Sequence, residues 1–189
     1  SGARSRGENL RLVLKVKEGT QALYKHDLYI SISDTHFDVY QMGGSLSVKA
    51  YSWLTLKKIF LKETTLYLEF NETKISFISP QISKAYDTIL TILPRILKSN
   101  ELLFAGILQT NTLPKPNPNT AILRLKQKVK YGNNHHRERA VDSIIETLRY
   151  YPFDIDLSKL EDQKNSLPLF ADILPLLPNM RSITVTNTA

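Results

Sequence analysis

Residues 10 to 79 are divided into seven short segments that favour β-strands, and turn-forming residues separate each segment from the next. In the first segment, leucine or valine occupies every second position from Leu10 to Val16, and Arg11, Lys15 and Lys17 lie at alternate positions. Because successive side chains of a strand point to opposite faces, this alternation predicts strands with one buried face. Short separators such as Gly43-Gly44-Ser45 favour hairpins. The pattern therefore predicts an antiparallel meander, a small barrel or sandwich, with strands at Leu10–Glu18, Asp27–Ser33, Phe37–Met42, Leu46–Tyr51, Leu54–Glu63, Leu66–Phe70 and Lys74–Ser79.

One amphipathic helix is predicted directly after the seventh strand. Ser79 suits an N-cap and Pro80 suits the first helical position. Apolar residues then recur at helical spacing as far as Leu97, and Pro94 should kink the helix because it lacks an amide hydrogen. The helix would cover the open end of the barrel, since neither its own apolar stripe nor the inner face of the sheet can remain in water. Seven strands followed by one helix is the order of a pleckstrin-homology (PH) domain.

The segment after this helix is strongly basic. Residues 111–149 carry eight basic and three acidic side chains, in a chain whose net charge is +7. Prolines and asparagines in Thr112–Asn119 predict a linker. From Ile122 to Tyr131, basic and apolar residues alternate, so an extended conformation would place four cations on one face: Arg124, Lys126, Lys128 and Lys130. A helix capped by Asn133 or Asn134 is predicted to follow and to reach Tyr150.

The last forty residues contain an internal repeat. Ile155 and Leu157 are matched 28 positions later by Ile183 and Val185, and Leu167–Leu177 between them has helical spacing. A strand and a helix that recur with a period near 28 are typical of leucine-rich repeats, of which about one and a half are present. Such repeats bury their apolar faces on their neighbours, so the segment predicts two parallel strands at the start of a longer solenoid, and we expect the chain to be a fragment.

Two stretches of the chain resemble the N-terminal part of the CARMIL family of actin capping-protein regulators. One runs from Lys74 to Leu97, where a strand, a Ser-Pro and an isoleucine-rich helix resemble the end of that family's PH domain. The other, Tyr151–Asn187, resembles the family's entry into its leucine-rich repeats. The expected fold class is therefore α+β: a disordered N-terminus (1–9), a PH-like seven-stranded antiparallel barrel with a C-terminal helix (10–110), a basic linker (111–150) and the first α/β leucine-rich repeats (151–189).

The resemblance implies a noncanonical PH domain in a leucine-rich-repeat scaffold that regulates actin. The second strand reads Asp27-Leu-Tyr-Ile-Ser and lacks the paired basic residues with which PH domains grip phosphoinositides. The only tryptophan, Trp53, starts a strand, whereas many PH domains carry one in the C-terminal helix. Weak, charge-driven binding to acidic phospholipid is therefore expected. The family's capping-protein motif lies beyond the repeats, so cytoskeletal partners would use regions outside this chain.

Two sets of basic residues are candidate lipid contacts. The first is the row Arg124, Lys126, Lys128 and Lys130; the second is Lys15, Lys17 and Lys25, with Arg11, at the barrel end where PH domains bind headgroups. A cation close to an anionic membrane contributes about 1 kcal/mol. The same residues also fit a solvated strand face, on which lysines guard against aggregation. A protein-interaction or self-association module, for example a homodimer, is the alternative function.

Other classes of protein are not favoured by the sequence. The chain has no cysteine, which fits a reducing cytosol and excludes disulfides, a thiol nucleophile and Cys-rich zinc sites. Adjacent His135 and His136 would point in different directions on a helix, so no metal or other cofactor is expected. No serine has a nucleophile-elbow motif, which argues against an enzyme. No RNP-like aromatic pair supports nucleic-acid binding. We expect a cytoplasmic protein, peripheral at the plasma membrane and cytoskeleton.

Overall fold

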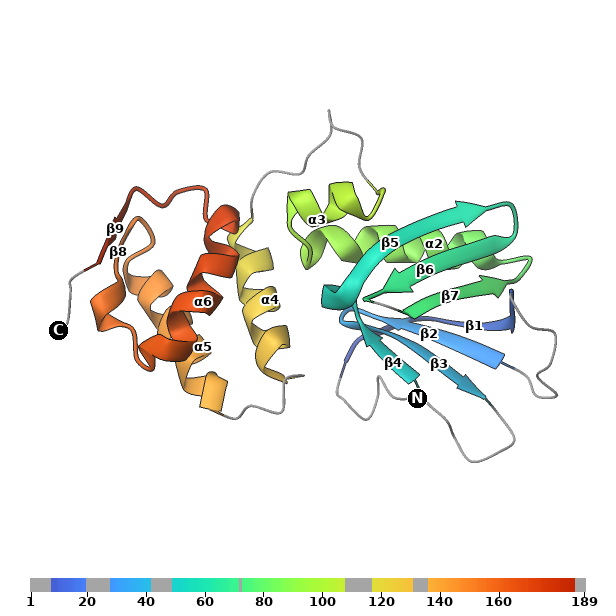
Figure 1. Ribbon diagram of the computed structural model, residues 1–189, viewed down its shortest axis with the longest axis horizontal. Coiled ribbons are helices and arrows are strands. Elements are labelled where there is room, and N and C mark those ends of the chain that lie inside the picture. The colour runs from blue at the N-terminus through green and yellow to red at the C-terminus, as the bar shows by residue number, and fades with distance from the viewer. Residues whose placement is uncertain are drawn as a thin grey trace. The chain divides into compact units, whose positions relative to one another are not determined.

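The computed structural model describes residues 8–19, 28–41, 49–71, 73–107, 117–130 and 136–185, apart from the side chains of Lys130 and His136. The chain divides into two compact units, unit 1 (residues 1–114) and unit 2 (residues 115–189) (Figure 1). Each unit has its own hydrophobic core.

Unit 1 is built on a seven-stranded antiparallel sheet with the strand order β4-β3-β2-β1-β7-β6-β5. β1 joins the two halves of this sheet, because its residues up to Val16 pair with β2, whereas Lys17 and Glu18 pair with β7. The separator Gly43-Gly44-Ser45 lies outside the described residues. All seven predicted strands have a counterpart in this sheet, and the predicted strand residues 27, 42 and 46–48 lie outside the described residues. The strands are β1 (Leu10–Glu18), β2 (Leu28–Ser33), β3 (His36–Gln41), β4 (Lys49–Ser52), β5 (Leu56–Lys62), β6 (Thr65–Phe70) and β7 (Thr73–Ile78).

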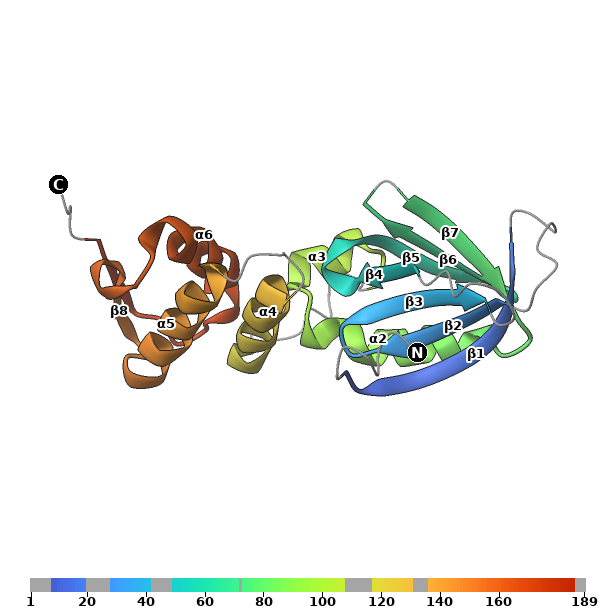
Figure 2. The same ribbon diagram turned by 90° about the horizontal axis from the view of Figure 1, so that it is seen from below.

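The predicted amphipathic helix is α2 (Ile82–Ile92), which lies against one face of the strands (Figure 2). Its predicted apolar stripe is buried, and the 3₁₀ turn Leu93–Arg95 follows where Pro94 interrupts the helical hydrogen bonds. The helix therefore packs on the sheet, whereas closure of this sheet into a barrel, with the helix over its open end, stays a prediction. Its buried residues are Ile82, Ala85, Ile89 and Ile92, continued by Leu93, Ile96 and Leu97.

The start of α2 differs from the prediction. Gln81, not Ser79, is the N-cap, and it forms no side-chain capping hydrogen bond. The Ser79 hydroxyl instead accepts a hydrogen bond from the Gln81 amide at 3.3 Å, so residues 79–81 form a turn before the helix. A short helix, α3 (Ser99–Phe104), was not predicted, and its last residue, Phe104, is 83% exposed.

The core of unit 1 is centred on aromatic rings between the two halves of the sheet. Trp53, in the 3₁₀ turn between β4 and β5, is fully buried, and its indole N–H donates to the Ser33 carbonyl at 2.9 Å. Its ring lies 5.9 Å from that of Phe37 and 6.0 Å from that of Phe70. A buried indole needs such a hydrogen-bond partner, so the geometry holds this tryptophan in one orientation.

The described residues of unit 2 form three α-helices and a two-stranded parallel sheet. The helices are α4 (Pro118–Lys130), α5 (His136–Tyr150) and α6 (Gln163–Ile173), and they share a core that includes Leu125, Ile144 and Phe170. β8 (Asp154–Asp156) pairs with β9 (Ser182–Thr184), with Ile155 opposite Ile183. The predicted pair of parallel strands, 28 residues apart and separated by a helix, is therefore confirmed.

The predicted extended conformation of Ile122–Tyr131 is wrong, because residues 118–130 form the helix α4. Ala121 and Leu125, four positions apart, face the core and are fully buried. Leucine, lysine, arginine and glutamine are good helix formers, so the local sequence supports a helix as well as it supports alternation. Both α4 and α5 belong to the core of unit 2, although residues 111–150 were predicted to be a linker.

Candidate functional site

The row of four cations predicted on a strand does not exist on α4, because residues at alternate positions point to different sides of a helix. Arg124 is 4% exposed and Lys128 is half-buried, one turn further along the same side. Lys126 is exposed. The side chain of Lys130 lies outside the described residues. The helix therefore places Arg124 and Lys128 on one side and Lys126 on another, whereas a strand would have brought all three to one face.

Arg124 and Lys128 instead bind a carboxylate inside unit 2. The Arg124 guanidinium donates to both carboxylate oxygens of Asp172 on α6, at 2.6 Å and 3.2 Å. The Lys128 ammonium lies 2.9 Å from the same carboxylate. The side chains of Arg124 and Asp172 are 5% and 16% exposed. This ion-pair cluster connects α4 to α6, so both cations have an anionic partner within unit 2.

The second predicted set of cations lies on β1. Lys15 and Lys17 are exposed, and both side chains point away from the core residues Leu14 and Val16. Lys25 lies outside the described residues. Lys15 and Lys17 are therefore predicted lipid contacts whose exposure is compatible with that role.

Arg11, also on β1, has an intramolecular partner. Its guanidinium donates to both carboxylate oxygens of Asp34, at 2.7 Å and 3.2 Å. The hydrogen bond to this carboxylate and its negative charge raise the pKa of Arg11. Arg95 lies 3.9 Å from the same carboxylate. Arg11 thus helps to hold the β2–β3 turn.

A buried polar cluster in unit 1 was missed by the sequence analysis. The Ser33 hydroxyl donates to Glu8 at 2.7 Å, and Nδ1 of His36 lies 3.2 Å from the other oxygen of that carboxylate. The side chains of Glu8 and His36 are 3% and 5% exposed. Nearby, the Ser31 hydroxyl donates to buried Asp38 at 3.3 Å. The cluster attaches Glu8, which was predicted to be disordered, to the sheet, and its burial keeps these groups from a substrate in solvent.

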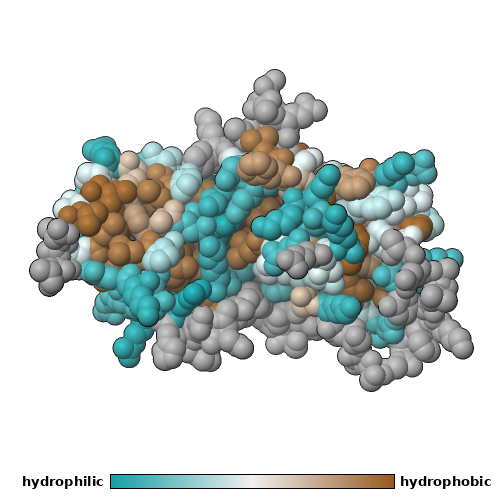
Figure 3. All heavy atoms as spheres, viewed as in Figure 1, coloured by the Kyte–Doolittle hydropathy of each residue, from teal (hydrophilic) through white to brown (hydrophobic). Residues whose placement is uncertain are grey.

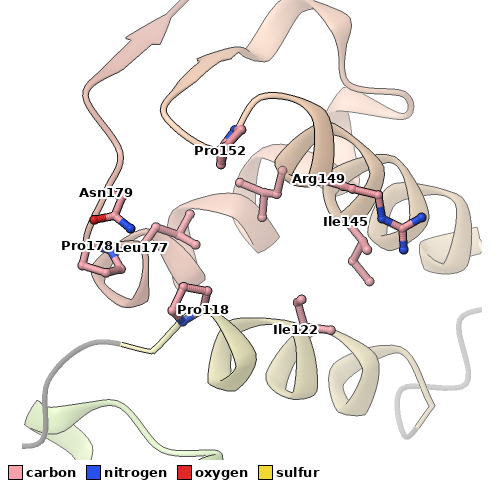
Figure 4. A pocket seen from close by; sticks show the side chains of 9 residues that line it. Pro118, Ile122, Ile145, Arg149, Pro152, Leu177, Pro178 and Asn179 are labelled. Carbon is pink, nitrogen blue, oxygen red and sulfur yellow. The ribbon is translucent and has the colours of Figure 1, made fainter.

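Unit 2 contains a largely apolar pocket of about 290 Å³ (Figure 4). Exposed Arg149 is the one charged residue among those that line it. This pocket could not be predicted from the sequence, because its walls come from segments that are far apart in the chain. The lining residues are Pro118, Ile122, Ile145, Leu148, Arg149, Pro152, Leu177, Pro178 and Asn179.

The described part of the chain offers neither a candidate metal site nor a candidate membrane-spanning helix. It contains no group of three or more histidine or acidic side chains that could hold a metal ion. Within the same residues, no helix combines the length and the apolar composition needed to cross a lipid bilayer.

Comparison with known proteins places the chain in no family. No protein-family model matches it, and no curated protein matches it. Among solved structures, the C-terminal domain of an unknown protein from Leishmania infantum is similar over 48% of this chain and 88% of that chain, with 12% sequence identity and a TM-score of 0.40.

Proposed function

We propose that unit 1 is a PH-like domain and that unit 2 begins a leucine-rich-repeat solenoid, in the arrangement of the CARMIL family. A seven-stranded antiparallel sheet followed by a helix on one face supports the first assignment. Two parallel strands 28 residues apart, with α6 between them, support the second.

The function that we propose for unit 1 is weak, charge-driven binding to acidic phospholipid at the cytoplasmic face of the plasma membrane. The exposed cations Lys15 and Lys17, on one face of β1, are the observation that carries this proposal. A lysine ammonium is a point charge on a flexible stem and suits a diffuse anionic surface better than one fixed phosphate. With Arg124 and Lys128 bound to Asp172, Lys126 is an exposed cation that α4 can add.

We expect the chain to sediment with vesicles that contain phosphatidylserine and to remain in solution with vesicles of phosphatidylcholine alone. Raising the salt from about 0.15 M to about 1 M shortens the screening length from about 8 Å to about 3 Å, so binding should fall steeply. The double substitution Lys15→Glu, Lys17→Glu should weaken binding about thirtyfold, since each cation near the membrane contributes about 1 kcal/mol and each 1.4 kcal/mol or so is a factor of ten. Co-sedimentation over a salt series measures these effects.

Lys126→Glu is the variant that tests α4 alone. Substitution of Lys128 by glutamate would place a second carboxylate beside Asp172 and destabilise unit 2, so its effect on binding would not report on lipid. Equal binding to neutral and acidic vesicles, or binding that does not change with salt, would refute the charge-driven mechanism.

Self-association is the second candidate function, and exposed apolar side chains favour it. Hydrophobic surface gathers over α6 and β8 of unit 2, whereas α4 is largely hydrophilic (Figure 3). Ile183 and Val185 are 39% and 71% exposed. A dimer measured by analytical ultracentrifugation, together with no binding to acidic vesicles, would favour this function over lipid binding.

The leucine-rich-repeat assignment predicts that another repeat would stabilise unit 2. An idealised repeat fused after Val185 should raise the melting temperature of unit 2, because each repeat buries its apolar face mainly on its neighbour. Differential scanning calorimetry measures this shift. The same fusion with Ile183→Asp and Val185→Asp is the control and should lose the gain. A fusion that melts like the parent chain would count against a solenoid.

A further inference from the structure

The second half of the sheet in unit 1 has an exposed face that is both aromatic and basic. Ile59 and Leu66 point into the core, so their neighbours along β5 and β6 point outward. In the register of the sheet, Phe60 lies opposite Tyr67. We call the following outward side chains the outer face: Lys58, Phe60 and Lys62 of β5, Tyr67 and Glu69 of β6, Lys74 and Ile78 of β7, and Lys17 of β1.

The two rings at the centre of this face are packed against each other. The ring centroids of Phe60 and Tyr67 are 4.6 Å apart, and their planes differ by 8°. The Lys58 ammonium lies 5.7 Å from the Phe60 centroid. Phe60 is nevertheless 42% exposed. Tyr67 therefore covers one face of the Phe60 ring, and the rest of that ring carries its exposure.

Lysines surround the aromatic pair. Lys17, Lys58, Lys62 and Lys74 are all exposed. Two carboxylates accompany them, Glu69, which lies 4.0 Å from Lys74, and Glu63 in the β5–β6 turn. Ile78 is 37% exposed and lies directly opposite Lys17, so an apolar side chain and a cation are neighbours there too. The face therefore has excess positive charge around an apolar centre.

We propose that the outer face is the surface that enters the membrane: Phe60 and Ile78 insert between the headgroups of acidic phospholipids while the lysines contact phosphate and carboxylate groups. This inference rests on the proposed function and names the surface that performs it. Aromatic rings favour the interfacial region of a bilayer, and lysine stems lie along apolar surface while their ammonium groups stay in water. An anionic leaflet matches both the charge of this face and its apolar centre.

Single-stranded nucleic acid is the other polyanion that binds sheets with aromatic and basic side chains. Its bases stack on the open faces of rings. Tyr67 and Phe60 stack on each other, and Lys58 approaches the Phe60 ring, so part of the ring surface on which a base could stack is already covered. Ring edges insert among lipid headgroups without needing an open face, which favours the membrane.

Vesicle binding by the full chain tests this surface directly. With phosphatidylserine-containing vesicles, Phe60→Ser should lower the partition coefficient roughly tenfold, because most of the apolar transfer of the ring is lost. Lys62→Glu should lower it about fivefold or more. Phe104→Ser, at an exposed phenylalanine of α3, and Lys84→Glu, at an exposed lysine of α2, are the matched controls and should change binding little.

A second variant reports insertion without weakening the surface. In Phe60→Trp, the new indole should shift its emission to shorter wavelength on binding and should be quenched by vesicles whose acyl chains carry bromine. The emission of buried Trp53, measured in the parent chain, is subtracted. Phe104→Trp is the control and should show neither change. Urea unfolding of each variant, followed by Trp53 emission, establishes that unit 1 remains folded.

The outcomes separate this inference from the proposed function. If the parent chain binds acidic vesicles but Phe60→Ser and Phe60→Trp behave like their controls, the outer face is not the surface that enters the membrane. The proposal of charge-driven binding would then stand. If the parent chain binds neither vesicle at low salt, the proposed function fails and the inference fails with it. Binding of a single-stranded RNA oligonucleotide that Phe60→Ser abolishes, without vesicle binding, would make the face a nucleic-acid surface and overturn the inference.

Discussion

Replacing Leu93 by aspartate should destabilise unit 1 by about 4 kcal/mol or more, a large part of the stability of an ordinary domain. Leu93 is fully buried in the 3₁₀ turn that follows α2, and it belongs to the core that α2 shares with the sheet. A carboxylate there would lose its hydration with no cation provided for it. Urea unfolding followed by Trp53 fluorescence measures the loss, because the only tryptophan of the chain lies in this core.

Thr91→Asp is the matched control for this substitution. Thr91 is exposed on α2, two residues before Leu93, so the same charge enters the same helix in water. We expect this variant to unfold close to the parent chain. A Leu93→Asp variant with the parental midpoint would mean that the end of α2 does not pack on the sheet.

Asp172→Ala should destabilise unit 2 by about 3–5 kcal/mol, because it leaves the buried Arg124 without its bidentate partner. The carboxylate of Asp172 also accepts the ammonium of Lys128, so its removal places two cations near each other with no anion between them. The helical signal in circular dichroism should therefore be lost at lower urea concentration. Trp53 fluorescence should report an unchanged transition, since that residue belongs to the other unit.

The double variant Arg124→Met, Asp172→Leu tests the cause of this effect. Replacing a buried ion pair by apolar side chains of similar size is often neutral or stabilising, so the double variant should recover most of the lost stability. Lys126→Ala, on the exposed side of α4, should have little effect. If Asp172→Ala alone unfolds like the parent chain, the ion pair does not hold α4 to α6.

The strands of unit 1 could be predicted because alternation and turn residues agree along the chain. Leu10, Leu12 and Leu14 alternate with exposed residues, and a strand places side chains at this spacing on one face of a sheet. The parallel pair of unit 2 could be predicted because Ile155 and Ile183 are separated by one repeat.

The conformation of α4 could not be predicted from alternation alone. Leu123, Leu125 and Val129 fit a strand pattern, but Ala121, Leu125 and Val129 also recur every four residues, as a helix requires. Tertiary packing selects the helix over the strand. Arg124 binds Asp172, 48 residues later, from a helix that packs on α6. No local pattern contains that partner, and the predicted basic row failed for this reason.

The pairing of Phe60 with Tyr67 on the outer face could have been predicted from the length of the β5–β6 turn, although not from alternation alone. Lys62 pairs with Thr65 across the two-residue turn Glu63–Thr64, so each step back along β5 matches one step forward along β6. A turn of this length is therefore enough to place Phe60 opposite Tyr67. The polar cluster of Glu8, Ser33 and His36 has no such signal, because Glu8 precedes the first strand.

The position of β1 in the sheet determines the order in which the chain can assemble. Every other neighbouring pair of strands in unit 1 follows directly in sequence, whereas Lys17 and Ile78 are 61 positions apart. Closing that loop costs more chain entropy than closing any hairpin of this sheet. During synthesis on a ribosome, β1 is made before the other strands of the sheet, but it cannot pair with β7 until that last strand has been synthesised. The two halves of the sheet can therefore form as separate hairpins early, and their union through β1 is the late event of folding.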